Sequence, residues 1–103
     1  MCMIKNNMRP IHPGEILRED YLLPLGITAY ALSIRLHVPA PRVNEVVGER
    51  RGITPNMALR LARFLNTTPR FLLNLQTSFD LKQTEIQQGD KIVQEISPLQ
   101  VAA

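Results

Sequence analysis

VPAPRVNEVVGERRGIT, residues 38–54, is the most informative stretch of this chain. It holds two prolines within three residues, then a short segment in which valine recurs, and then two adjacent arginines. Pro39 and Pro41 each hold φ near −65° and lack an amide hydrogen, which suits a stiff turn that leads into a helix. Because a residue before proline disfavours the α-helical region, we predict that this helix begins at Pro41 and runs to Val47.

A second helix is predicted directly before this turn, in the segment TAYALSIRL, with Thr28 as its N-terminal cap. Two helices joined by a tight turn, the second of them short, form the helix-turn-helix pattern. Their apolar residues have the spacing that would bury one side of both helices: Leu32, Leu36, Val38, Val43, Val46 and Val47. Ser33 supplies a small side chain for the place where the two helices approach each other. This pattern favours a DNA-binding function.

The same spacing predicts which side chains face outward from the short helix: Ala40, Pro41, Asn44 and Glu45, with Arg42 on the flank. A helix that presents such residues can enter a major groove about 12 Å wide. Asn44 could read adenine, and Arg42 could reach guanine or phosphate. Glu45 could accept a hydrogen bond from cytosine, or pair with Arg42 or Arg50. Arg50 and Arg51 follow where the chain would pass the DNA backbone, so they indicate phosphate contacts; exposed, solubilising charge is the alternative.

Three further helices have recognisable start signals. The first, HPGEILREDYLL, has His12 as its cap and Glu15 where it can reach back toward free amides. Pro24 and Gly26 are expected to end it. The other two open with Thr-Pro pairs, at 54–55 and at 68–69, which place a capping hydroxyl before a proline at the first helical position.

Beyond Phe79 the signal weakens. DLKQTEIQQGD could prolong the last helix or form a sixth, up to Gly89. KIVQEISPLQ, which contains β-branched residues, suggests a strand that would need a partner, such as the same tail of a second chain; the alternative is a tail packed on its own domain or disordered. With five helices and at most one strand, the predicted fold class is all-α. We divide the chain into an N-terminal arm (1–8), a helix-turn-helix domain (9–79) and a C-terminal extension (80–103).

Composition narrows the functional classes. The 103 residues suit one small domain. Residues 1–79 hold ten Lys or Arg against five Asp or Glu, whereas residues 80–103 hold two against four. Seven arginines and no lysine lie between positions 35 and 70, which suits a polyanionic partner. No apolar run is long enough for a membrane span or a secretory leader, so we expect a cytoplasmic protein.

Enzyme and metal-binding functions lack support in the sequence. Cys2 stands alone, so no internal disulfide is expected. His12 and His37 have no third ligand at a recognisable spacing, so we expect no metal and no other cofactor. No nucleophile–base set and no Gly-rich phosphate loop is present, so we expect no enzymatic activity.

At four places the chain resembles a known family: RPIHPGEILREDYLLPLGIT, RVNEVV, RRGITPNMALRLARFL and LLNLQTSFDL. These segments are similar to HigA-type antitoxins, also described as VapI-like proteins, of the Cro/repressor (XRE-like) helix-turn-helix superfamily. The resemblance covers about residues 9–90 and is most specific at HPGEIL, RRGIT and LNLQ.

The resemblance implies a five-helix, lambda-repressor-like domain that forms a homodimer and binds palindromic operator DNA. It further implies that the protein represses its own operon and neutralises a HigB/RelE-like toxin that cleaves messenger RNA. By resemblance, the outward residues Ala40, Pro41, Asn44 and Glu45 occupy positions that face base edges, and Thr28 a position that touches phosphate. The half-sites of a two-fold dimer would lie about one helical turn apart, roughly 10 base pairs.

The chain departs from the family pattern in three respects. Ala29 stands where the superfamily often has a DNA-contacting glutamine, and His37 stands in the turn where glycine with positive φ is common. Ala40 and Pro41 cannot hydrogen-bond a base edge, so the recognition surface is expected to make few such bonds. A stand-alone repressor without a toxin is the alternative function. A toxin-binding surface could lie on the first helix with the N-terminal arm, or on the acidic tail between Asp80 and Glu95.

Overall fold

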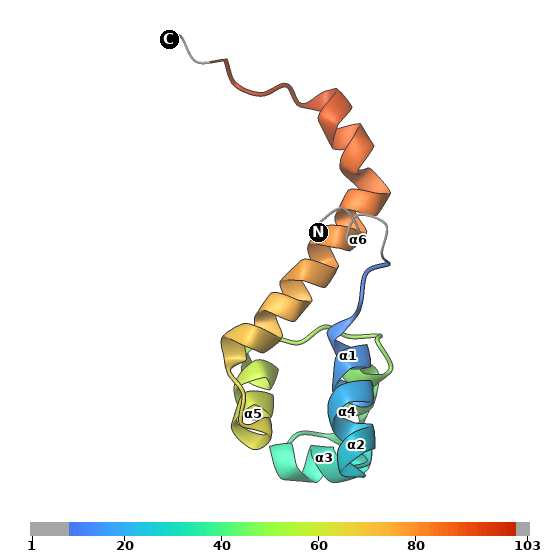
Figure 1. The fold of residues 1–103 in the computed structure, drawn as a ribbon, viewed down its shortest axis with the longest axis vertical. Helices are drawn as coiled ribbons and strands as arrows, with labels where there is room; N and C mark the ends of the chain where they lie inside the picture. Colours follow the sequence, from blue (N-terminus) through green and yellow to red (C-terminus); the bar gives the residue numbers. More distant parts are fainter. Residues whose placement is uncertain (1–8, 101–103) are drawn as a thin grey trace.

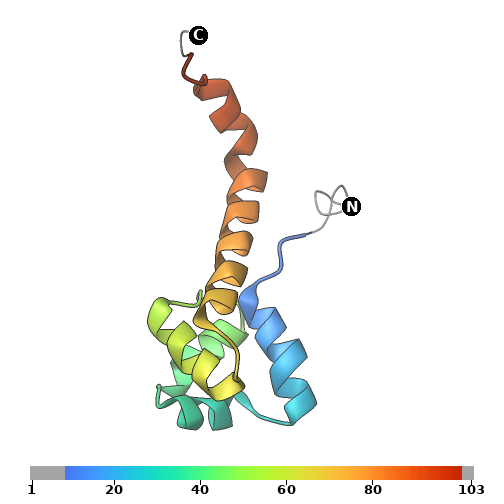
Figure 2. The same cartoon turned by 60° about the vertical axis from the view of Figure 1, so that its left-hand side comes forward.

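The computed structural model describes residues 9–100, which form helices and, within that range, no strand. Pro13–Ile16 (α1), Leu17–Leu22 (η2) and Leu23–Leu25 (α2) make one continuous first helix, followed by Ala29–Leu36 (α3), Ala40–Val47 (α4), Pro55–Leu65 (α5) and Pro69–Glu95 (α6). Figures 1 and 2 show a globular end, built from the first five labelled helices and the first turns of α6, from which the rest of α6 projects. The all-α prediction is confirmed. The predicted arm, with Cys2, lies outside the described residues.

The first helix begins at a histidine cap. Nδ1 of His12 accepts a hydrogen bond from the amide of Gly14 at 2.8 Å, which confirms the predicted cap. Glu15 does not reach back toward free amides as predicted. Its carboxylate forms a two-pronged ion pair with Arg9, at 3.0 and 2.9 Å, because a guanidinium and a carboxylate match in geometry.

The middle of the first helix is a wider, π-helical turn. The amide of Leu23 donates to the carbonyl of Arg18, five residues back. Pro24 follows and does not end the helix as predicted; the helix continues to Leu25, and Gly26 closes it with a left-handed φ of 67°. A proline ring clashes with the carbonyl four residues before it, and the wider turn makes room for the ring.

Threonine hydroxyls cap α3, α5 and α6, as predicted. Oγ1 of Thr28, Thr54 and Thr68 accepts the amide of the third residue on, at 3.0, 3.2 and 3.1 Å respectively. Each such cap contributes about 1 kcal/mol. The threonines therefore set where three of the helices begin.

The core forms where α3, α4 and α5 meet the first helix and the root of α6. The residues that were predicted to face inward from the helix-turn-helix are buried, with Leu32, Leu36, Val43 and Val46 at most 3% exposed. In α5, Ala58, Leu61 and Ala62 are also buried, whereas Leu65, Val38 and Val47 are half-buried against the cluster.

Helix α6 runs through Gly89 to Glu95, so the alternative of a prolonged last helix is confirmed and the predicted strand is wrong. A tail packed on its own domain is also wrong, since residues 84–88 and 90–100 are exposed. An α-helix satisfies its backbone hydrogen bonds within one segment, whereas a strand needs a neighbour. None of the helices described combines the length and apolar character that crossing a bilayer requires.

Candidate nucleic-acid interface

The turn between α3 and α4 is held by its own backbone. His37 adopts φ 58°, the left-handed conformation expected at this position. The amide of Val38 donates to the carbonyl of Ser33 at 3.1 Å, which closes the end of α3. Ser33 is itself buried at 3% exposure, in agreement with the small side chain predicted between the two helices. The turn therefore has a fixed shape before any ligand binds.

Helix α4 begins at Ala40, one residue before the predicted start at Pro41. Pro39 is extended, with ψ 141°, and its carbonyl accepts the amide of Arg42 at 3.0 Å. Pro41 occupies the second helical position, where a missing amide breaks no bond because the first-turn amides have no carbonyl partner within the helix. The restraint on the residue before proline is only a preference, and the N-terminal turn overrides it here.

The residues predicted to face DNA lie on the side of α4 away from the buried Val43 and Val46, or in the segments beside it. On α4, Pro41, Arg42 and Asn44 are exposed, and Ala40 and Glu45 are half-buried. The predicted phosphate contacts Thr28, Arg50 and Arg51 are all exposed. Thr28, at the start of α3, lines the same shallow pocket as Val47 at the end of α4.

Glu45 pairs with Arg51, and with neither of the predicted partners Arg42 and Arg50. Nε of Arg51 donates to Oε1 of Glu45 at 2.6 Å. This hydrogen bond and the positive charge of Arg51 hold the pKa of the Glu45 carboxyl below its ordinary value. Both side chains are more than a third exposed, so solvent screens the pair and its contribution to stability is small. A phosphate could therefore displace the carboxylate from Arg51 at small cost.

Two of the central arginines are engaged within the domain. The guanidinium of Arg60 donates to the carbonyls of Leu36, at 2.8 Å, and His37, at 3.4 Å, so it caps the end of α3. The guanidinium of Arg35 lies 5.6 Å from the centre of the Phe64 ring, at cation–π distance. Arg35 and Arg60 therefore have structural roles, although both are among the seven arginines that suit a polyanionic partner.

The sequence interpretation missed Gly14, which brings the first helix against α4. A Cβ atom at this position would lie 1.9 Å from the carbonyl oxygen of Val46, so a larger residue cannot be accommodated without movement of the backbone. The available signal was a glycine within a helix, where it costs roughly 0.5–1 kcal/mol relative to alanine and needs a reason.

Gln76 was also missed, and it anchors the loop that carries Arg50 and Arg51. Its Oε1 accepts the amide of Ile53 at 2.7 Å, and its Nε2 donates to Asp80 at 3.0 Å. Gly52 leaves room for this side chain, since a Cβ there would meet Gln76 at 2.9 Å. The motifs RRGIT and LNLQ therefore meet in the structure through Ile53 and Gln76, which are 23 residues apart in the sequence.

Arg18 is the third missed residue. It leaves the π-helical turn toward the end of α4, where Nη1 donates to the carbonyl of Val47 at 2.6 Å and Nη2 donates to Glu49 at 3.2 Å. No sequence signal marked this contact, because it joins residues about 30 positions apart. The first helix therefore holds α4 in place through two residues, Gly14 and Arg18.

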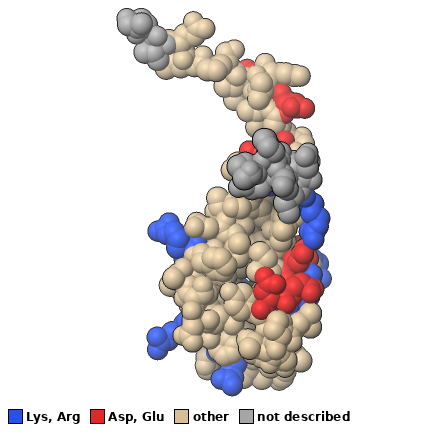
Figure 3. Space-filling view, in the orientation of Figure 1, with Lys and Arg blue, Asp and Glu red and all other residues tan. Residues whose placement is uncertain are grey.

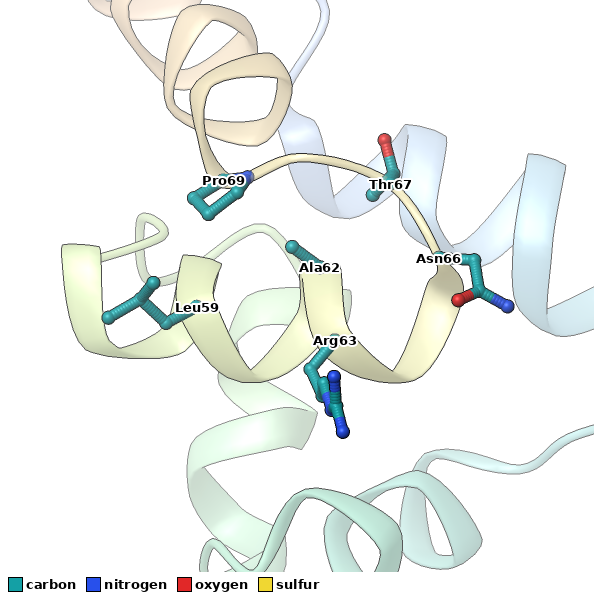
Figure 4. A pocket seen from close by; sticks show the side chains of 6 residues that line it. All are labelled: Leu59, Ala62, Arg63, Asn66, Thr67 and Pro69. Atoms are coloured by element: carbon teal, nitrogen blue, oxygen red, sulfur yellow. The ribbon is translucent and has the colours of Figure 1, made fainter.

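Acidic and basic side chains are unevenly spread over the face shown in Figure 3. Acidic side chains gather over the first helix and recur on the projecting part of α6, whereas basic side chains stand out at the opposite edge and at the lower end, near α3, and also next to the acidic group. Figure 4 shows a shallow pocket between α5 and the loop that leads to α6. Arg63 is the single ionisable residue among those that line it, so this pocket holds no acid–base pair.

A short helix with an outward polar face, packed through a tight turn on the helix before it, defines a helix-turn-helix protein. No protein-family model matches the sequence. Virulence-associated protein I of Dichelobacter nodosus is 50% identical over 99 residues, which is 96% of this chain and 90% of that protein.

Two solved structures are also similar to this chain. Antitoxin HigA of Pseudomonas aeruginosa with the higBA promoter matches with a TM-score of 0.87 and 46% identity, over 89% of this chain and 100% of that one. Antitoxin GraA in complex with its operator matches with a TM-score of 0.87 and 51% identity, over 91% and 95%.

The chain therefore belongs to the HigA and VapI family of helix-turn-helix antitoxins, as the resemblance of its motifs implied. This is a family of antitoxins and regulators, not of enzymes.

Proposed function

We propose that this protein is the antitoxin of a type II toxin–antitoxin pair, which binds the operator DNA of its own operon as a homodimer and neutralises a RelE-like toxin in the cytoplasm. The observation that carries the proposal is the exposed face of α4, flanked by Arg50 and Arg51, in a chain about half identical to antitoxins that were solved with promoter or operator DNA.

On this proposal, α4 enters the major groove. Asn44 is exposed and reads adenine, and Arg42 is exposed and contacts guanine or phosphate. Ala40 and Pro41 make van der Waals contacts with base edges. The carboxylate of Glu45 is occupied by Arg51 in the free protein, which favours a role in orienting that arginine over a role in reading cytosine.

Phosphate contacts on both sides of the groove would fix the position of α4. Thr28 and the free amides at the start of α3 lie on one side, where the positive end of the helix dipole favours an anion. Arg50 and Arg51 lie on the other. Two copies would place their recognition helices in successive major grooves, since one eight-residue helix covers only a few base pairs.

A gel shift of the protein with its own promoter fragment tests the DNA-binding part. We expect a discrete, salt-sensitive complex with the wild type and none with Arg50→Ala/Arg51→Ala. Arg51→Ala alone should weaken binding to all sequences alike and lower the slope of log K against log salt by about 1. Asn44→Ala should instead relax the base preference at one position. A wild type that forms no specific complex would contradict the proposal.

The toxin part is tested separately by a search for a small basic protein encoded immediately upstream of the gene, followed by co-expression of the two proteins. A stable complex supports an antitoxin. DNA binding without any such complex would identify a stand-alone repressor.

A further inference from the structure

The chain leaves α4 through a complete Schellman turn. The amide of Arg50 donates to the carbonyl of Glu45 at 2.8 Å, and the amide of Glu49 donates to the carbonyl of Val46 at 3.0 Å. Glu49 takes the left-handed conformation that such a turn requires, with φ 65°. Glycine is the usual residue at this position because a Cβ atom in the left-handed conformation crowds the following carbonyl oxygen. A glutamate at this place therefore needs a compensating contact.

Arg18 provides that contact. Nη2 donates to the Glu49 carboxylate at 3.2 Å, and Nη1 donates to the carbonyl of Val47 at 2.6 Å, one of the carbonyls that the last turn of a helix leaves without an amide partner. Nε binds Glu19 on the same helix at 3.1 Å. Arg18 is thus tied to its own helix at one end of the guanidinium and to the end of α4 at the other.

We propose that Arg18 and Glu49 form a latch that positions Arg50 and Arg51 for contact with DNA. The inference rests on the proposed DNA-binding function. The Arg50 amide makes one of the two hydrogen bonds of the turn, so the conformation of Glu49 sets the direction in which both arginines leave α4. Arg18 also lines the shallow pocket that Thr28 and Val47 share. The latch therefore lies between the phosphate contacts proposed on the two sides of the groove.

The latch acts through preorganisation, and neither of its residues needs to touch DNA. A loop that is already fixed loses less conformational entropy when it binds than a loop that must first be ordered. Replacement of Glu49 tests this mechanism, because the latch and simple charge predict opposite changes in DNA affinity. As a negative charge near a polyanion it opposes binding, so its removal should strengthen binding if charge alone matters. If the latch acts, its removal weakens binding.

The first variant is Glu49→Gly. Glycine adopts the left-handed conformation without strain, so the domain still folds, but glycine also adopts many other conformations and leaves the turn without the Arg18 contact that fixes it. We expect affinity for the promoter fragment to fall about fivefold at constant salt, with the salt slope unchanged. The matched control is Glu19→Gln, which removes the other carboxylate on Arg18 and leaves the latch intact. Its affinity should change less than twofold.

The second variant is Arg18→Gln, alone and combined with Glu49→Gly. We expect Arg18→Gln to lose at least as much affinity as Glu49→Gly, because it also removes the hydrogen bond to Val47, and the double variant to lose no more than Arg18→Gln alone, because the Arg18–Glu49 interaction can be removed only once. Unchanged or tighter DNA binding by Glu49→Gly would overturn the proposal, as would additive losses. A salt slope lowered by about 1 in Arg18→Gln would also overturn it, since Arg18 would then contact phosphate itself.

Amide hydrogen exchange in the free protein keeps this test separate from the proposed function. We expect the Glu49 and Arg50 amides to exchange faster in Arg18→Gln than in the wild type, and Glu19→Gln to leave them unchanged. Unchanged exchange in Arg18→Gln would overturn the latch whatever the DNA result. A wild type that fails to bind its promoter would overturn the proposed function and leave the exchange result standing.

Discussion

Helix α6 is one continuous helix with two unlike halves. Near its start, Leu72 is 3% exposed, and the ring of Phe79 contacts that of His12 with centroids 4.8 Å apart. Farther along, Ile86 is 61% and Val93 is 77% exposed, and this half projects from the domain in both ribbon views (Figures 1 and 2).

The apolar spacing does not change between the two halves. Leu72, Phe79, Ile86 and Val93 recur at seven-residue intervals, on one stripe of the helix. The same pattern produces core in the first half and surface in the second, because α5 and the first helix pack only against the first half. Periodicity identifies which residues share a face, and only the neighbouring elements decide whether that face is buried. We propose that residues 9–79 are the folding unit and residues 80–103 an extension of it.

Two glycines and two apolar residues make this comparison testable. The largest effect is expected from Gly14→Ala in the domain. The new Cβ would lie 1.9 Å from the backbone oxygen of Val46, so the first helix and α4 must separate. We expect the free energy of unfolding in urea to fall by about 3 kcal/mol, at the upper end for overpacking. A loss below about 1 kcal/mol would show that the two helices can separate at small cost.

Leu72→Ala and Ile86→Ala compare the halves of α6 directly. Leu72 is buried, so its truncation should cost about 2–3 kcal/mol in chemical denaturation. Ile86 is exposed, so the same measurement should change by less than about 0.5 kcal/mol. An equal loss at both positions would mean that the outer half is buried against a partner under the conditions of the experiment.

The contact between α6 and the first helix should depend on pH through His12. Burial lowers the pKa of this imidazole below its ordinary value of 6.5, although the charges of Glu49 and Asp80 oppose the shift. The unfolded chain therefore binds the proton first. Stability should be complete above about pH 6.5 and should fall as the pH drops from there toward the folded pKa, by no more than about 1.4 kcal/mol per pH unit.

His12→Asn is the control for this prediction. Asparagine can still accept the Gly14 amide as a helix cap but does not titrate. The free energy of unfolding should therefore fall less between pH 7 and pH 5 in His12→Asn than in the wild type. Equal pH dependence in the two proteins would exclude His12 as the source.

A small effect of opposite sign is expected from Gly89→Ala. A Cβ at this position meets nothing closer than Glu85 Cβ at 3.9 Å, so there is room for it. Alanine is a better helix former than glycine by about 0.8–1 kcal/mol, so helical content by circular dichroism should rise. The same change from glycine to alanine is thus expected to destabilise the protein at position 14, in the domain, and to favour the helix at position 89, in the outer half of α6. A loss of helicity at position 89 would show that the outer half needs glycine.

Much of the fold could be predicted from short-range signals. The caps at His12, Thr28, Thr54 and Thr68 depend on a side chain and an amide two or three residues away, so a local pattern predicts them. The left-handed turn at His37 was expected from the family pattern, in which this position of the turn is often glycine with positive φ. The strand expected after Gly89 was wrong, because isoleucine and valine have only weak conformational preferences and no partner strand lies beside them.

The sequence predicted which residues of the candidate site face outward, but it did not predict which side chains contact one another. The outward face of α4 follows from helical spacing once Val43 and Val46 are assigned to the core. The pairing of Glu45 with Arg51 instead of Arg42 or Arg50 depends on how the Schellman turn redirects the chain, which spacing does not give. Arg60 carries the same charge as Arg50, and its position beside two backbone carbonyls at the end of α3 could not be predicted.

By itself, the sequence determined the helices, their caps, the inward and outward faces of the helix-turn-helix, and the family to which the chain belongs. These properties arise from interactions within a few residues or from a spacing that a helix imposes. Only the tertiary structure decided that Gly14 admits the Val46 carbonyl, that Arg18 holds Glu49, that Gln76 anchors the arginine loop, and that α6 is half core and half surface. Each of these depends on distances between residues far apart in the chain, which are set when the helices pack together.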